Sequence, residues 1–144
     1  WTHPFEVDYL LGCAMLLSSS VLQDIGFFDE RFFFYYEDLD FCVRARQAGY
    51  RLLVVPQAKM WHKGAGSAGQ NSPFRVYHMA RGSAIFFGTH ARGSQRVASL
   101  LFRSGSALKS SLHFILRGQF SLLRSYWRGI WDGWQALEMG RKDR

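Results

Sequence analysis

The stretch over residues 32–56 restricts the possible fold more than any other part of the sequence. It begins with five consecutive aromatic residues, continues with three carboxylates within four positions, and ends in an apolar segment closed by a proline. Carboxylates beside a wall of aromatic side chains are costly to bury unless they are paired or used for chemistry. The function of the chain therefore depends on what Glu37, Asp38 and Asp40 do.

A helix is predicted over residues 37–48, directly after the aromatic run. Its apolar residues have helical spacing, and Gly49 stands where a left-handed helix terminator is expected. Asp38 and Asp40 fall in the first turn, where free N–H groups and the helix dipole favour anions. Arg44 follows Asp40 by four residues, so these two side chains can pair on one helix face.

The motif Asp38-Leu39-Asp40 allows three interpretations. A D-x-D in a loop after a strand can bind a divalent metal ion, because both carboxylates can then reach it. Haloacid dehalogenase phosphatases also place a D-x-D after an apolar strand, but Thr or Val usually follows it, whereas Phe41 follows here. Within a helix the two Asp side chains point about 200° apart, which is poor geometry for one ion. Helix capping with an ion pair to Arg44 is the third interpretation, and spacing alone leaves it open.

The segment before the aromatic run is predicted to hold one strand and one short helix. Residues 7–17 form an apolar run that predicts a buried strand, with a bulge or a close backbone approach at Gly12. Residues 21–25 are predicted to form a short helix, because serines at 18–20 can cap its start and Gly26 can end it.

Two more strands are predicted after the acidic helix, over residues 51–55 and 59–63, and a loop with three glycines follows at 64–72. The loop contains GAGSAG, which is close to a dinucleotide-binding fingerprint. It lacks a buried parallel strand before it, a prompt helix after it and a downstream acid at the expected distance. We interpret it as a mobile lid or a connector.

The second half of the chain is predicted to be helical. Residues 74–88 form one helix with Pro73 at its start, and residues 95–137 follow a helical period that Gly118 divides in two. At about 100° per residue, one face of this period is apolar. This face holds Leu101, Leu108, Leu112, Ile115, Tyr126, Ile130 and Leu137. The arginines that project to the opposite side are Arg96, Arg103, Arg117, Arg124 and Arg128.

The net positive charge comes from the end of the chain. The net charge is +7, and residues 92–144 carry ten Lys or Arg against three Asp or Glu, so they hold the whole excess. An anionic partner is therefore expected. Three tryptophans among the arginines favour an anionic membrane surface as that partner over residues 92–144, while packing on the rest of the domain is the alternative. Nucleic acid is not expected, because no binding motif accompanies the charge.

Cysteine and histidine positions give weaker signals. Cys13 and Cys42 have neither metal nor disulfide spacing, so we expect reduced thiols in a cytoplasmic protein. No run of 18 apolar residues predicts a membrane span. His62 follows a predicted strand and precedes the glycine loop, where a functional role competes with that of an ordinary surface histidine.

The order and spacing of several segments resemble the C-terminal half of family 2 glycosyltransferases with a GT-A fold, especially the rhamnosyltransferase-like branch. The matching segments are VDYLLGCAMLL (7–17), IGFFDERFF (25–33), YEDLDFCVRARQAGYR (36–51), VP (55–56) and WH (61–62). Weaker matches are the Y-x-x-x-R of Tyr77 and Arg81, and RGIWDGW at 128–134. No single motif is decisive, but their joint order is specific.

The resemblance implies an α/β fold class in two parts. Residues 1–72 would be the acceptor-side, C-terminal part of a GT-A (Rossmann-like) mixed-sheet domain, and residues 73–144 a basic region of amphipathic α-helices. The nucleotide-binding strands and the metal-binding D-x-D of the family are absent from this sequence. We therefore expect this chain to be the acceptor and base half only, from a truncated or excised protein.

The resemblance also implies roles for individual residues. Asp38 would be the general base, taking a proton from an acceptor hydroxyl as that oxygen attacks the sugar anomeric carbon in one inverting displacement. Glu37 would help to position the acceptor, while Arg44 would hold Asp40. His62 matches a position that completes the metal site in some relatives. The predicted substrate-binding residues are Gly12, Tyr36, Trp61 and Arg81.

The partners follow from the same resemblance. They are a nucleotide-sugar donor, a glycan or lipid-linked acceptor, and a divalent metal ion (Mg²⁺ or Mn²⁺) with most of its ligands in the missing N-terminal half. The expected location is the cytoplasmic face of the plasma membrane, as a peripheral protein. A second hypothesis is a non-catalytic module that binds a membrane or another protein.

Overall fold

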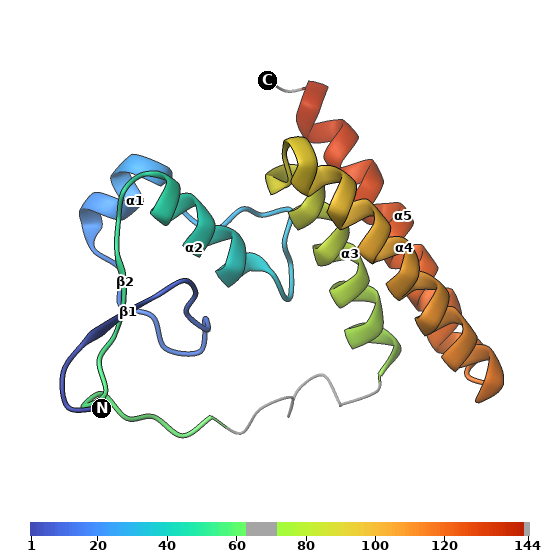
Figure 1. The fold of residues 1–144 in the computed structure, drawn as a ribbon, viewed down its shortest axis with the longest axis horizontal. Coiled ribbons are helices and arrows are strands. Elements are labelled where there is room, and N and C mark those ends of the chain that lie inside the picture. Colours follow the sequence, from blue (N-terminus) through green and yellow to red (C-terminus); the bar gives the residue numbers. More distant parts are fainter. Residues whose placement is uncertain (63–71, 143–144) are drawn as a thin grey trace. The chain divides into compact units, whose positions relative to one another are not determined.

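A computed structural model describes residues 1–62 and 72–142 of this chain, and side chains up to residue 140. The chain divides into two compact units, Trp1–Gly64 and Ala65–Arg144. Figure 1 shows strands and two helices in the first unit and three longer helices in the second.

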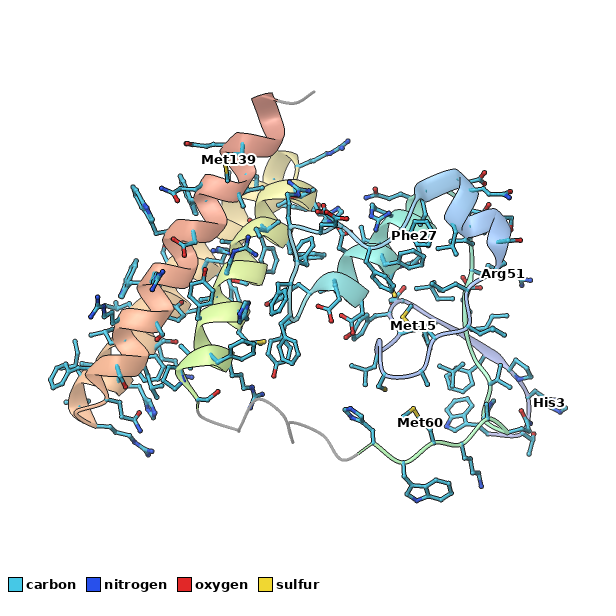
Figure 2. All side chains as sticks on the ribbon, turned by 180° about the vertical axis from the view of Figure 1, so that it is seen from behind. His3, Met15, Phe27, Arg51, Met60 and Met139 are labelled. Carbon is cyan, nitrogen blue, oxygen red and sulfur yellow. The ribbon has the colours of Figure 1, made fainter. Side chains whose placement is uncertain are left out.

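The described part of the first unit combines two helices with a small antiparallel sheet. Its elements are β1 (Phe5–Val7), α1 (Ser19–Ile25), α2 (Glu37–Gln47) and β2 (Leu52–Val54). In the sheet, Phe5 pairs with Val54 and Val7 with Leu52. Cys42 and Ala45 of α2 pack with Leu52 in the apolar core, and Figure 2 shows Met15, which packs against this core, inside the unit.

Both helices of the first unit begin or end as their sequences predict. The Ser18 hydroxyl accepts a hydrogen bond from the Val21 N–H, so it caps the start of α1. Gly26 ends α1 with a φ of +74°, and Gly49 follows α2 with a φ of +88°. Only glycine adopts such angles without strain, which explains why both helices stop there.

The predicted strand over residues 7–17 is wrong, because β1 ends at Val7 and residues 8–18 have irregular structure. The backbone of this segment bonds to α2 instead of to a neighbouring strand. The Leu10 N–H donates to Cys42 Sγ (3.4 Å), and the Gly12 N–H donates to Asp38 Oδ2 (2.9 Å). An apolar run in a sequence indicates that some of its side chains are buried, but it does not indicate where its backbone N–H and C=O groups form hydrogen bonds.

The strand predictions after α2 have mixed outcomes. β2 confirms the strand predicted over residues 51–55, with three residues in the ladder. Residues 59–62 form no strand, and their side chains are exposed, so they have no sheet neighbour in the described part of the chain. Lys63 and the predicted glycine loop up to Asn71 lie outside the described residues. The sheet of the described residues has only two strands, so the predicted mixed sheet is absent there.

The second unit contains the predicted helices. They are α3 (Pro73–His90), α4 (Gly93–Leu116) and α5 (Phe120–Lys142). Ser72 caps α3 by accepting from the Arg75 N–H, with Pro73 in the first turn. Gly118, with a φ of +65°, lies in the turn between α4 and α5, which run side by side (Figure 1).

Glycines on α5 let it pack very closely on α3. A Cβ at Gly133 would lie 2.7 Å from Ala84 Cβ and 2.8 Å from the Arg81 carbonyl oxygen, and one at Gly129 would overlap the Tyr77 carbonyl. The Tyr77 hydroxyl donates to Asp132 Oδ2 (2.7 Å) beside this contact. The two weakly matching segments, Y-x-x-x-R and RGIWDGW, therefore pack against each other.

Candidate active site

The Asp38 carboxylate lies in the first turn of α2 and is held by groups from a distant segment. Its Oδ2 accepts hydrogen bonds from the Tyr9 hydroxyl and the Gly12 N–H, both at 2.9 Å. Its Oδ1 accepts from the Leu39 N–H at 2.8 Å. All three donors are neutral, so they fix the direction of the carboxylate without pairing its charge with a cation.

Gly12 leaves little room for a side chain next to Asp38. A Cβ at this position would lie 3.2 Å from Asp38 Cβ, which is tighter than most Cβ contacts, and 3.5 Å from Asp38 Oδ2, which is an ordinary contact. A side chain would push the loop away from Asp38 and lengthen its hydrogen bond. The predicted proximity of Gly12 to the donor sugar stays a prediction, whereas its contact with Asp38 is observed.

Tyr9 is a member of the site that sequence reasoning missed. Burial, together with the hydrogen bond and the charge of Asp38, raises the pKa of the Tyr9 hydroxyl well above its ordinary value. The hydroxyl therefore stays protonated at neutral pH and donates to the carboxylate. The only hint in the sequence was a tyrosine hydroxyl within the mainly apolar run 7–17. No sequence pattern links Tyr9 to Asp38, which lies 29 positions away.

Asp40 has a structural role: it is buried and forms the ion pair with Arg44 that the four-residue spacing predicted. Asp40 is 1% exposed, and its Oδ2 lies 2.7 Å from Arg44 Nε. The same guanidinium donates to the carbonyls of Ile25 (2.7 Å), the last residue of α1, and Phe27 (2.8 Å), which lies two residues further on. The predicted ion pair is thus confirmed. The two carboxylates of the D-x-D have different partners, which argues against a shared metal ion.

The backbone before the acids is strained. Tyr35 and Tyr36 have φ values of +67° and +73°, and Tyr36 is the left-handed residue that precedes α2. Such conformations cost roughly 1–3 kcal/mol each for residues other than glycine and occur most often at functional sites. They direct the chain from the aromatic run into Glu37 and Asp38. The predicted substrate contact of Tyr36 is not tested by this geometry.

Glu37 carries an unsatisfied oxygen beside Asp38. Its Oε2 is buried and has no hydrogen-bond partner among the described residues. Burial, followed by the charge of Asp38, raises the pKa of the Glu37 carboxyl. Buried polar atoms in folded proteins nearly always have a hydrogen-bond partner. An unpaired buried oxygen next to a candidate base therefore marks a position where a bound substrate could donate a hydrogen bond.

The other predicted site residues are not joined to this group by the structure. Trp61 (89% exposed) and His62 lie at the end of the described part of the first unit, and no described hydrogen bond connects either to Asp38. Arg81 lies on α3 in the second unit, where its backbone contacts α5. Their substrate and metal roles stay predictions.

The described residues do not form a metal site by themselves. Residues 1–62 and 72–142 contain no group of three or more His, Cys, Asp or Glu side chains that could hold an ion. His62 can offer one imidazole nitrogen, whereas Mg²⁺ and Mn²⁺ sites need several oxygen ligands as well.

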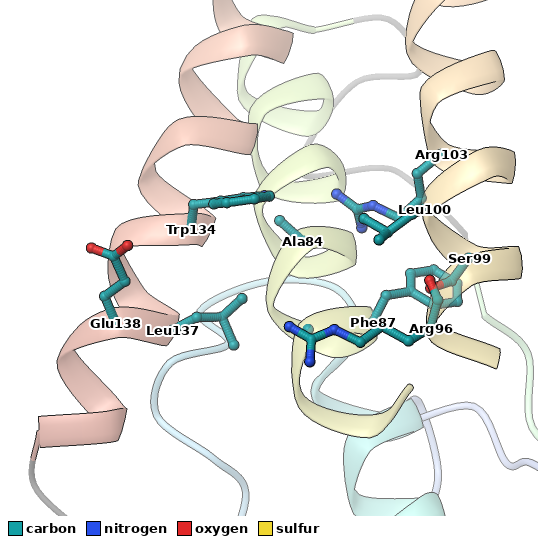
Figure 3. A pocket seen from close by; sticks show the side chains of 10 residues that line it. Ala84, Phe87, Arg96, Ser99, Leu100, Arg103, Trp134, Leu137 and Glu138 are labelled. Carbon is teal, nitrogen blue, oxygen red and sulfur yellow. The ribbon is translucent and has the colours of Figure 1, made fainter. Parts of the chain in front are cut away.

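A cavity of about 200 Å³ lies between the three helices of the second unit. Figure 3 shows Arg96 and Arg103 of α4 opposite Trp134 and Leu137 of α5 across it. The Arg103 guanidinium donates to the carbonyl of Ser83 and lies 5.6 Å from the Phe87 ring centroid, so it helps to hold α4 on α3. None of the predicted site residues lines this cavity.

The comparisons with known proteins agree on one family. The model of Glycosyl transferase family group 2 matches residues 7–133. A similar protein is the N-acetylglucosaminyl-diphospho-decaprenol L-rhamnosyltransferase of Mycobacterium tuberculosis, 31% identical over 81% of this chain and 40% of the relative. Another is the dTDP-rhamnosyl transferase RfbF of Shigella flexneri, 28% identical over 57% of this chain and 30% of the relative.

A shorter match is the rhamnosyltransferase WbbL of Escherichia coli, 42% identical over 35% of this chain and 19% of the relative. The chain thus spans 40% or less of the length of these relatives. No solved structure matches the chain.

Proposed function

Because this chain belongs to glycosyl transferase family group 2, we propose that it supplies the acceptor side and the general base of an inverting glycosyltransferase. The predicted resemblance to the rhamnosyltransferase-like branch is confirmed by the relatives. The observation that carries the proposal is the Asp38 carboxylate, held in a fixed direction by Tyr9 and Gly12 with no cation paired to it among its described hydrogen bonds.

In the proposed reaction, Asp38 accepts the proton of an acceptor hydroxyl. The oxygen then forms a bond to the anomeric carbon of the donor sugar, and the bond from that carbon to the nucleoside diphosphate breaks. One displacement from the opposite side inverts the anomeric centre. A base must keep its proton-accepting oxygen aimed at the substrate, and the donors from Tyr9, Gly12 and Leu39 supply that orientation.

Glu37 has a separate role in the proposal. Its unpaired Oε2 would accept a hydrogen bond from a second hydroxyl of the acceptor sugar. That bond would satisfy a buried oxygen that the protein itself leaves without a partner. Gly12, Tyr36, Trp61 and Arg81 stay the proposed substrate contacts.

The substrates are proposed from the relatives. Three of them are named as rhamnosyltransferases, so we propose a nucleotide-activated rhamnose as the donor. The mycobacterial relative is named for an N-acetylglucosaminyl-diphospho-decaprenol substrate, so we propose a glycan on a polyprenyl diphosphate as the acceptor. Such an acceptor would place the protein peripherally on the cytoplasmic face of the plasma membrane.

The donor site and the metal ion are proposed to lie mostly outside these 144 residues. A divalent ion, Mg²⁺ or Mn²⁺, would supply charge neutralisation for the leaving diphosphate. His62 is the residue of this chain proposed to ligate it. The described residues alone form no such site.

The test compares Asp38→Asn with Asp8→Asn in the complete enzyme, measuring sugar transfer from the nucleotide donor. Asp8 is the matched control, because its exposed carboxylate bonds only weakly to the unit, through Arg46. Loss of a general base lowers the rate by roughly 10²–10⁴-fold, and Asp8→Asn should change it by less than about twofold.

Full activity of a normally folded Asp38→Asn protein would remove the base assignment. If the complete wild-type protein transfers no sugar from any nucleotide donor, the alternative of a non-catalytic membrane-associated or protein-binding module is favoured instead.

A further inference from the structure

The α4 helix exposes a row of aliphatic side chains, called here the aliphatic stripe, along its outer side. The stripe consists of Val97, Leu101, Leu108, Leu112 and Ile115, whose side chains are 50–73% exposed. Their spacing places them on one face of a helix of 3.6 residues per turn. The helical period in the sequence predicted the last four of these residues on one face. It also joined them to residues of α5, whereas the turn at Gly118 separates the two helices.

Few side chains hold α4 onto its neighbours. Its single buried residue is Ala107, although the helix has 24 residues. The aliphatic stripe therefore faces away from α3 and α5. A row of five large apolar side chains in water is unusual for a folded domain and marks a surface that binds something.

Tryptophans of α5 widen this apolar surface beside the α4 stripe. The Trp127 indole N–H donates to the Ser111 hydroxyl (3.1 Å). Ser111 lies three residues after Leu108 and four before Ile115, so this bond holds the indole beside the stripe. Trp131 and Trp134 follow at helical spacing, and all three rings are about half exposed. Figure 2 shows side chains projecting along the outer sides of these helices.

The charge around this surface indicates which kind of partner can bind to it. No Asp or Glu occurs between Asp40 and Asp132, so α3, α4 and most of α5 carry only basic and neutral residues. Lys109, Arg117 and Arg124 come from α4, its end and α5. Two copies of such a surface would repel each other, whereas an anionic lipid surface attracts each nearby cation.

We propose that the α4 stripe and the adjoining tryptophans dock the second unit onto an anionic lipid bilayer. The aliphatic side chains enter the boundary between headgroups and acyl chains, and the basic side chains reach the lipid phosphates. Indole rings suit this depth, because they have an apolar body and one N–H donor. None of the described helices is long and apolar enough to cross a membrane.

The test is flotation of the complete chain with vesicles of phosphatidylcholine alone or with phosphatidylglycerol added. The double variant Leu101→Ser/Leu108→Ser should lower binding to the anionic vesicles by at least about tenfold, because two aliphatic side chains no longer enter the lipid. Leu16→Ser is the matched control, since Leu16 is fully exposed in the first unit, and it should leave binding unchanged. Circular dichroism establishes that the variants are folded.

Three results would overturn the proposal: no binding of the wild-type chain to anionic vesicles, equal binding of the double variant, or equal binding to neutral vesicles at all salt concentrations. A wild-type dimer that the double variant converts to a monomer, without a loss of vesicle binding, would assign the stripe to a second copy and also overturn it. The assay involves no sugar transfer, so it can fail or succeed independently of Asp38.

Discussion

The two units of this chain use opposite means to fix their structure. In the first unit, polar groups hold two carboxylates in place. Tyr9 and Gly12 donate to Asp38 from a segment far away in sequence, and Arg44 pairs with Asp40 within α2. In the second unit, backbone contact at Gly129 and Gly133 joins α3 to α5, and α4 is left with an apolar outer side. The comparison shows that hydrogen bonds to carboxylates organise the first unit, whereas close helix packing organises the second.

The largest effect on stability is expected from Arg44→Ala. The substitution leaves the carboxylate of Asp40 buried without its cation and frees two carbonyls at the end of α1. A broken buried pair costs about 3–5 kcal/mol. Denaturant unfolding measures this cost, and Arg46→Ala is the control, because its pair with Asp8 is exposed and should contribute less than about 1 kcal/mol. Equal losses in both variants would show that Asp40 is not part of the scaffold.

A smaller but still large loss is expected from Gly133→Val in the second unit. The added side chain would overlap Ala84 and the Arg81 carbonyl, so α5 must move away from α3. Overpacking of this kind costs about 1–3 kcal/mol. Gly105→Ala is the control, since a Cβ there meets nothing within 4 Å and α4 should gain up to about 1 kcal/mol. A Gly133→Val protein as stable as wild type would mean that α3 and α5 are not in close contact.

The smallest effect concerns Glu37 and depends on pH. Because burial raises its pKa in the folded state, the folded protein holds the proton more tightly than the unfolded chain does. The stability from Glu37 is therefore complete below its unfolded pKa of about 4.3 and is lost as pH rises through the folded value.

Glu37→Gln should accordingly be more stable than wild type at pH 7, by about 1 kcal/mol or less, with a difference that shrinks toward pH 4. Unfolding at several pH values measures this. The exposed Glu30→Gln serves as the control, with no expected difference. A Glu37→Gln protein that is less stable at pH 7 would indicate that the carboxylate has a partner.

Helix boundaries and the ion pair between Asp40 and Arg44 could be predicted from sequence. Gly26, Gly49 and Gly118 mark helix ends because their positive φ values suit glycine. The spacing of Asp40 and Arg44 indicated an ion pair, since residues four apart lie on the same helix face. These signals are local, so a single sequence contains them.

Contacts between distant segments could not be predicted. The segment 8–18 has the composition of a strand, yet its backbone N–H groups donate to side chains of α2. The same apolar residues are compatible with a strand and with this irregular segment. The bond from Tyr9 to Asp38 and the left-handed backbone of Tyr35 and Tyr36 also have no local signature. The predicted apolar face of α4 was real, but its exposure depends on how closely α5 packs on α3.

The most direct test of the central claim is the single-turnover rate of Asp38→Asn in the complete enzyme, with donor and acceptor saturating. We expect the chemical step to slow by roughly 10²–10⁴-fold while acceptor affinity stays within about threefold of wild type, because the amide cannot take the proton. A chemical step within twofold of wild type would contradict the assignment of Asp38 as the base.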